Sequence, residues 1–191
     1  MELLRKTITN IEDRRKDNSD KKELFSKNRH PHPASFYKEQ WAFIEDTAVR
    51  ENISYQLQYL EFMIYLYNDY QLYLTMESLL CKDIIVLVGG VVEAALFDLI
   101  QSAKKCSGLP MEGRTDFTIL LGQAFHEYGF LDKTLWHFFH NLRKTRNNVH
   151  LTAADFKEYI AYTIEQANEC IENLEKFREK VESKKGLRHH V

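Results

Sequence analysis

Apolar residues recur every three or four positions along most of this chain, which is the spacing of one face of an α-helix. The pattern predicts helices over 35–74 with a break near Asn52, and over 76–106, 117–128, 133–149 and 153–185. Residues 1–28 are rich in charge, and their few apolar positions make one stripe on a short amphipathic helix. We therefore expect an all-α helical bundle with long central helices over 34–191, preceded by an N-terminal charged helical arm over 1–33.

Capping residues and helix breakers mark where these helices begin and end. Short polar residues stand at the expected N-caps: Ser35, Thr115 or Asp116, and Asp132. Thr152-Ala-Ala-Asp155 resembles a capping box and is expected to open the last helix. Gly129 and Gly186 are expected to end two helices. Pro31 and Pro33 disfavour helix at the residues before them, so His30 and His32 are expected in a loop.

The helix expected over 76–106 is apolar nearly all round between residues 84 and 96, which indicates a central helix packed against 133–149 and 153–185. Gly89 and Gly90 interrupt it, each costing a helix interior about 1 kcal/mol relative to alanine. Close approach of another helix would offset that cost. Glu93 follows in the same apolar run, where an unpaired carboxylate is costly. We expect it either to pair with Arg143 or Arg146, or to reach solvent at a groove edge.

The C-terminal half of the segment 35–74 contains many aromatic residues: Tyr55, Tyr59, Phe62, Tyr65, Tyr67, Tyr70 and Tyr73. Aromatic rings can stack on nucleic-acid bases. The same segment is acidic, however, and an acidic element repels phosphate. We therefore expect these rings to serve the core or a protein interface.

The helix expected over 133–149 carries chemistry as well as packing. Its apolar stripe consists of Leu135, Phe138, Leu142 and Val149. A polar stripe at a 3-4-3 spacing consists of His140, Arg143, Asn147 and His150, with Arg146 beside it. This stripe has no carboxylate, and guanidinium and imidazole groups together can hold a phosphate and move a proton. The same residues near a helix C-terminus can also satisfy free carbonyls and complement the helix dipole, so that alternative stays open.

Composition limits the kinds of protein this can be. A chain of 191 residues with 44% apolar residues suits one domain with or without an arm. The net charge of −2 is not that of a bulk nucleic-acid binder, so any RNA contact needs a local patch. Three widely spaced cysteines argue against a disulfide framework and a zinc site, and they fit the reducing cytoplasm.

Membrane and metal sites are not expected either. The N-terminus lacks the apolar core of a signal peptide, and the most apolar run, 84–100, is short for a bilayer and contains Glu93 and Asp98. His126, His137 and His140 have no acid positioned with them. We expect a cytoplasmic protein with no membrane contact, no metal and no cofactor.

The run Leu142-Arg-Lys-Thr-Arg-Asn-Asn-Val-His-Leu151 resembles the signature of the HEPN superfamily, small all-α domains bearing Arg-x(4–6)-His. Arg143 and His150 fit that signature, and Arg146-Asn147 resembles the Arg-polar pair common before its histidine. Residues 86–100 are similar to the family's core helix with small residues and a Glu, and 130–139 to the run-in to its motif. The resemblance covers about residues 75–180. Thr152 stands where many catalytic members have Tyr.

This resemblance implies a metal-independent endoribonuclease that cleaves RNA by 2′-OH attack at an Arg/His site formed at a homodimer interface. It also implies a toxin or defence role with an antitoxin-like protein partner. The residues it implicates are Arg143, His150, Arg146 and Asn147 as catalytic, and Glu93 and His140 as supporting. The alternative is a non-catalytic HEPN-like module that binds RNA, nucleotide or protein, which Thr152 and the near-neutral charge favour. A third interpretation is a structural helical domain whose Arg/Asn/His face is a hydrogen-bonded helix junction.

Overall fold

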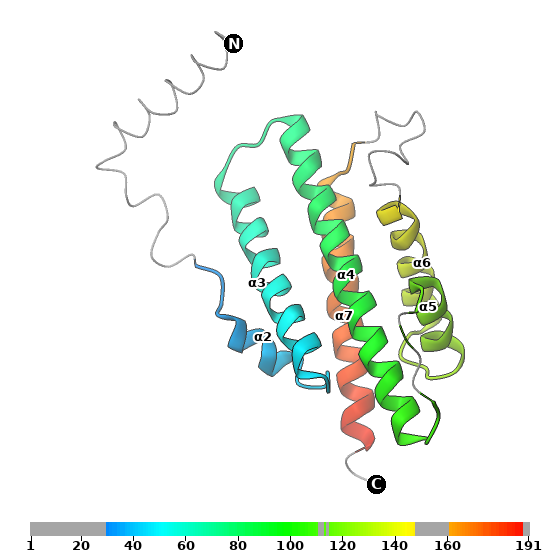
Figure 1. The fold of residues 1–191 in the computed structure, drawn as a ribbon. Helices are drawn as coiled ribbons and strands as arrows, with labels where there is room; N and C mark the ends of the chain where they lie inside the picture. The colour runs from blue at the N-terminus through cyan, green and yellow to red at the C-terminus, as the bar shows by residue number, and fades with distance from the viewer. Residues whose placement is uncertain (1–29, 111–112, 114, 148–160, 189–191) are drawn as a thin grey trace. The chain divides into compact units, whose positions relative to one another are not determined.

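The computed structural model describes residues 30–110, 113, 115–147 and 161–188, and within them all regular secondary structure is α-helical. The helices are α2 (Ala34–Gln40), α3 (Thr47–Asp69), α4 (Leu74–Cys106), α5 (Phe117–His126), α6 (Lys133–Asn147) and α7 (Ile164–Arg188) (Figure 1). The prediction of an all-α bundle is confirmed. The expected arm lies outside the described residues, apart from the loop residues that precede α2.

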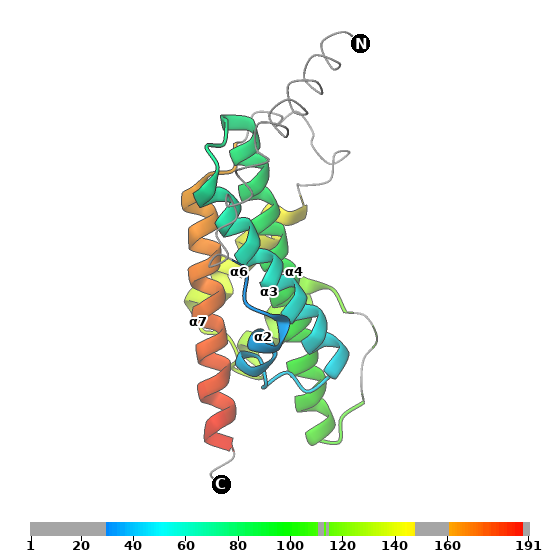
Figure 2. The same cartoon turned by 90° about the vertical axis from the view of Figure 1, so that its left-hand side faces the viewer.

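Helix α4 is the centre of the bundle formed by α2–α7. It packs against α3, α5, α6 and α7 (Figures 1 and 2), and its buried side chains extend from Cys81 to Lys104. A helix with neighbours on several sides needs an apolar surface around most of its circumference, which residues 84–96 supply. The predicted packing of this helix against the motif helix and the last helix is therefore confirmed. None of the described helices is long and apolar enough to cross a bilayer.

The helix expected over 35–74 is two helices, so the predicted break near Asn52 is wrong. α2 ends at Gln40, and the chain turns through residues 41–46 before α3 begins. Asp46 caps α3, its Oδ1 accepting hydrogen bonds from the backbone N–H groups of Ala48 at 2.8 Å and Val49 at 3.0 Å. Ser35 is not an N-cap: Pro33 holds that position without a side-chain cap, and Ser35 lies inside α2.

A buried carboxylate holds the turn between α2 and α3 in place. Asp98 on α4 is only 4% exposed. Its Oδ2 accepts from the backbone N–H of Glu45 and its Oδ1 from that of Asp46, both at 2.9 Å. Lys185 of α7 donates to the carbonyl of Phe43 at 2.7 Å. The turn is thus set by residues far away in the sequence, which is why local pattern did not place it.

The N-terminal ends of α5 and α6 follow the predicted caps. Asp116 accepts from the backbone N–H of Thr118 at 2.6 Å, and Asp132 from that of Leu135 at 2.9 Å. Gly129 has a φ of +60°, the left-handed conformation that glycine adopts without strain. α5 itself ends at His126, two residues before the predicted end at Tyr128.

The last helix begins later than predicted. Residues 161–163 are not helical, and α7 opens at Ile164 with a different capping box. The Thr163 N–H donates to Gln166 Oε1 at 3.1 Å, and the Gln166 N–H donates to Thr163 Oγ1 at 3.4 Å. The box expected at residues 152–155 lies outside the described residues. Gly186 does not end the helix, which continues to Arg188.

Three packing predictions also change. A Cβ on Gly90 would meet nothing within 4 Å, so the close helix approach expected at Gly90 is wrong. On α6, Phe139 is fully buried between Leu135 and Leu142, whereas the expected Phe138 is half-buried. On α3, the exposed fractions of Tyr55, Tyr59 and Phe62 are 53%, 50% and 40%, so these rings are not core residues. Their side chains project from α3 at i, i+4 and i+7, which is one exposed helix face.

Candidate functional site

Helix α6 is unusual in this bundle because its charges have one sign. From Lys133 to Asn147 the helix contains no Asp or Glu, although the whole chain is net negative. Its basic and imidazole residues are Lys133, His137, His140, Arg143, Lys144 and Arg146. The acid that caps it, Asp132, is paired with Lys180 of α7 at 3.2 Å. An element with this charge pattern attracts anions locally even in an acidic protein.

Arg143 lies half-buried on α6, which packs against both α4 and α5. Its Nε is buried and has no hydrogen-bond partner among the described residues. A buried donor without an acceptor is destabilising, so such groups call for a physical explanation. An anionic oxygen bound beside Arg143 would supply the missing acceptor, because a guanidinium binds carboxylate and phosphate oxygens in a forked geometry.

Helix α5, which packs against α6, adds two features. Gln123 Oε1 is buried and lacks a hydrogen-bond partner among the described residues. At the start of the same helix, hydrogen bonds from Thr118 hold the pKa of Asp116 below its ordinary value, and the charge of Arg143 adds to that effect. The charge of Arg143 therefore acts on the N-terminal end of α5, the helix that packs against α6.

A column of rings runs from α5 onto α6. Trp136 is stacked with Phe125 at a centroid distance of 5.5 Å and an interplanar angle of 28°. One turn further along α6, His140 is stacked with Trp136 at 5.4 Å and 19°. His126 and His137 meet the Trp136 ring edge-on at 6.4 and 4.8 Å. The column therefore leads from α5 towards the basic end of α6.

The environment of His140 favours its neutral form. Burial lowers the pKa of His140 below its ordinary value, and the charges of Lys144, Arg143 and His137 lower it further. At neutral pH the ring is therefore an uncharged imidazole. It can accept a proton or a hydrogen bond, and it can stack as an aromatic ring.

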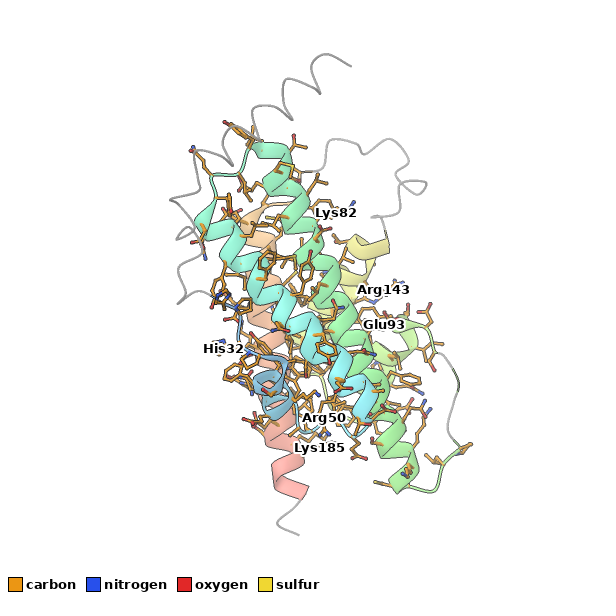
Figure 3. The ribbon with its side chains drawn as sticks, turned by 60° about the vertical axis from the view of Figure 1, so that its left-hand side comes forward. His32, Arg50, Lys82, Glu93, Arg143 and Lys185 are labelled. Carbon is orange, nitrogen blue, oxygen red and sulfur yellow. The ribbon has the colours of Figure 1, made fainter. Side chains whose placement is uncertain are left out.

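Glu93 lies on the face of α4 that belongs to the same region. It is half-buried, and Figure 3 shows Glu93 on α4 and Arg143 on α6, two helices that pack together. Pairing of Glu93 with Arg143 or Arg146 stays a prediction, because the Arg146 side chain is not described. The position of Glu93 opposite a basic helix agrees with the reason the sequence singled it out.

The remaining predicted site residues lie at or beyond the end of α6. Arg146 and Asn147 occupy its last turn, and their side chains are not described. His150, Thr152 and Val149 lie outside the described residues. The structure thus places Arg143 and His140 one turn apart on α6 and Glu93 on α4, which packs against α6, and it leaves the pairing of Arg143 with His150 as a prediction.

The ring column and a second polar cluster were not predicted. Trp136 and His140 are four residues apart, so their contact could have been expected from helical spacing, but Phe125 reaches them only through tertiary packing. The cluster surrounds Glu61 on α3. Its carboxylate accepts from the His32 N–H at 2.6 Å, from the Tyr37 hydroxyl at 2.5 Å and from the Tyr65 hydroxyl at 2.5 Å.

Ring nitrogen Nδ1 of His32 also lies 2.8 Å from Glu61 Oε1. Burial alone would raise the pKa of Glu61, but the hydrogen bonds from Tyr37, Tyr65 and His32 outweigh it and lower that pKa. The cluster ties the chain before α2 to α3, since His32 stands in the loop where it was expected. Its role is structural.

No protein-family model, no curated protein and no solved structure matches this chain. The resemblance to the HEPN superfamily therefore depends on the sequence alone, on the motif around Arg143 and His150 and on the stretches 86–100 and 130–139. Within the described part of the chain, no three His, Cys, Asp or Glu side chains are grouped so that they could hold a metal ion.

Proposed function

We propose that this protein is a metal-independent endoribonuclease of HEPN type, with Arg143 and His150 as its reacting groups. The observation that carries the proposal is Arg143 itself, whose buried guanidinium Nε has no acceptor among the described residues and which stands on a helix that has no carboxylate. The sequence spacing places His150 two turns further on if the helix continues. Arg146 and Asn147 are proposed to assist by binding the same phosphate.

The proposed reaction is attack of an RNA 2′-OH on the adjacent phosphorus. A base removes the 2′-OH proton, the new O–P bond forms, and the bond to the 5′-oxygen breaks as an acid protonates that oxygen. The products are a 2′,3′-cyclic phosphate and a 5′-OH. Arg143 would stabilise the negative charge that develops on the phosphoryl oxygens. His150 would serve as base, and His150 of a second subunit as acid.

A homodimer follows from this division of roles, because one motif supplies one histidine at the reacting position. A two-fold interface brings two copies of the same residues together automatically. Light scattering at tens of micromolar should therefore give twice the chain mass of 22.7 kDa. A monomeric mass would remove the acid–base pair from the proposal.

The test is cleavage of a mixed RNA pool by the wild-type chain and its variants, with folding checked by circular dichroism. His150→Ala should lower the rate by ~10²–10⁴-fold, which is the usual contribution of one proton-transfer group. Arg143→Ala should cost ~10²–10³-fold, the range for losing one charge-stabilising donor. The matched control is Arg50→Ala on the acidic helix α3, which should cleave like the wild type. EDTA should have no effect, since Arg and His supply the chemistry.

Cleavage that persists in His150→Ala, or that EDTA removes, would contradict the proposal. The second candidate function is RNA binding without cleavage. The observation that favours it is the ring column on α5 and α6, which can bind bases whether or not a reaction follows. Binding of RNA by a chain that releases no cyclic phosphate would establish this alternative.

A further inference from the structure

Two sets of stacked rings in this bundle, one on α3 and one on α5 and α6, have opposite electrostatic settings. On α3, Tyr59 and Phe62 are stacked at 6.2 Å on a helix whose charged residues are Arg50, Glu51, Glu61 and Asp69. On α6, Trp136 and His140 are stacked at 5.4 Å on a helix without any acid. A single-stranded nucleic acid needs stacking surfaces and positive charge together, and only the α6 rings have both.

We propose that the stacked rings of Phe125, Trp136 and His140 form a platform on which bases of single-stranded RNA stack, with the adjoining phosphates held by Arg143 and Lys144. The proposal depends on the proposed function for the identity of the bound strand as RNA. It goes beyond that function by assigning the binding of the bases to a surface made by two helices, outside the Arg-x(6)-His motif.

The stacked rings and the basic side chains follow one another along α6. The ring column ends at His140, and Arg143 and Lys144 follow one turn later. Trp136 and His140 are half-buried, and the exposed residues His126 and His137 meet the Trp136 ring edge-on, so one edge of the column borders exposed side chains. The low pKa of His140 agrees with a stacking role, because the imidazole is neutral at pH 7 and lies close to the charges of Arg143 and Lys144.

The test measures binding separately from cleavage. The probe is a fluorescently labelled single-stranded 2′-O-methyl oligonucleotide, which has no 2′-OH to attack, titrated with the full-length protein by fluorescence anisotropy. His140→Ala should weaken binding by on the order of 5- to 100-fold, the range for losing one base–aromatic stack. His140→Phe keeps a neutral ring and should restore most of the affinity. Trp136→Leu should weaken binding by a similar factor.

Tyr59→Ala on α3 is the matched control, since it removes an exposed stacked ring from an acidic helix, and it should bind like the wild type. Tryptophan fluorescence gives an independent readout. Trp41 is 2% exposed and Trp136 is half-buried, so quenching of the emission by added oligonucleotide should come from Trp136. If Trp136→Leu fails to fold, the His140 pair and the quenching still decide the matter.

Equal affinity of His140→Ala and the wild type, without quenching, would overturn the platform. Inorganic polyphosphate that competes as well as an unlabelled oligonucleotide at the same phosphate concentration would also overturn it, because polyphosphate has charge but no bases. A lower mass of His140→Ala by light scattering would mean that the rings face a second copy of the chain instead. A wild-type protein that binds the oligonucleotide as expected but does not cleave RNA would contradict only the proposed function. Failures of the two proposals are therefore distinguishable.

Discussion

At the scale of single residues, five carboxylates fix helix starts, a turn and a loop by accepting hydrogen bonds. Three of them cap helices: Asp46, Asp116 and Asp132. Asp98 holds the turn between α2 and α3, and Glu61 accepts hydrogen bonds from residues in and before α2. Each of these carboxylates accepts hydrogen bonds from at least one backbone N–H group. Charge-assisted bonds of this kind are stronger than neutral ones, and they are lost when the carboxylate is protonated.

Glu61→Gln tests this at the most heavily bonded carboxylate. An amide has one acceptor oxygen and places its NH₂ against donors, so the substitution should cost about 1–3 kcal/mol of unfolding free energy at pH 7. The folded-state pKa of Glu61 lies below its ordinary value of 4.5. Its contribution to stability is therefore full above about pH 4.5 and is lost as the pH falls through the lowered value.

Urea unfolding of both proteins between pH 7 and pH 3 measures this contribution. The difference in unfolding free energy between wild type and Glu61→Gln should shrink as the pH falls below 4.5. Glu39→Gln, a change at an exposed acid of α2, should leave the pH profile of the wild type unchanged. A difference that stays constant over the whole range would show that the Glu61 charge does not stabilise the fold.

At the scale of elements, helix ends and helix interiors have different causes. The ends of α5 and α6 follow from local caps, whereas the turn between α2 and α3 depends on a carboxylate from α4. Helix interiors follow packing, and most positions of α4 are apolar because helices surround it. Asp98→Asn tests the cause of the turn, and Gly90→Ala tests the cause of the helix interior.

Asp98→Asn should destabilise the protein by about 1–3 kcal/mol, because the amide nitrogen would face the backbone N–H of Glu45 or Asp46 and leave it without an acceptor. The measurement is the free energy of unfolding in urea. Asp83→Asn is the matched control, since Asp83 is exposed on the same helix, and it should change stability by less than about 0.5 kcal/mol. Equal effects of the two substitutions would mean that Asp98 does not hold the turn.

Gly90→Ala should stabilise the protein by about 1 kcal/mol, since alanine is the better helix former and its Cβ meets nothing within 4 Å. Gly129→Ala should do the opposite, by about 1–2 kcal/mol, because φ is +60° there. The Cβ at position 129 would also lie 2.9 Å from Lys184 Nζ. Thermal melts of both variants decide the point, and a fall in Tm for Gly90→Ala would restore the idea of a close helix contact.

At the scale of the whole molecule, charge is segregated between helices. The chain has a net charge of −2, but the charged side chains of α6 are all basic, and α3 has more acidic than basic side chains. Among the helices that the structure describes, α6 is therefore the one that a nucleic acid should meet. That expectation follows from the charges alone and does not depend on any reaction.

RNA affinity should then fall with salt, and few residues should set the slope. For single strands, the logarithm of the binding constant falls with log salt by ~0.7 per phosphate contacted. Lys144→Ala should remove about one phosphate contact and so lower the magnitude of that slope by ~0.7. Lys176→Ala on α7 should leave the slope unchanged. Binding titrations of the non-cleavable oligonucleotide between 50 and 200 mM salt, roughly the range over which this effect is large, give both slopes. Identical slopes for the two variants would mean that RNA does not bind along α6.

The sequence by itself determined the all-α class, the central position of α4 and the basic stripe on α6. These features depend on residue spacing and on composition within one helix, which the chain order displays directly. The caps at Asp116 and Asp132 and the turn at Gly129 are local for the same reason. The arginine of the candidate site was also visible in the sequence.

Only the tertiary structure decided which groups each side chain meets. The turn at residues 41–46 depends on Asp98, more than fifty residues away in sequence, so no local pattern could place it. Tyr55, Tyr59 and Phe62 are exposed because the buried face of α3 is formed by other residues of that helix. The stacking of Phe125 on Trp136 arises where α5 packs on α6, and the Nε of Arg143 is buried on α6, which packs against α4, α5 and α7. Burial and ring contacts between helices depend on how the helices pack, and helical spacing alone does not specify that.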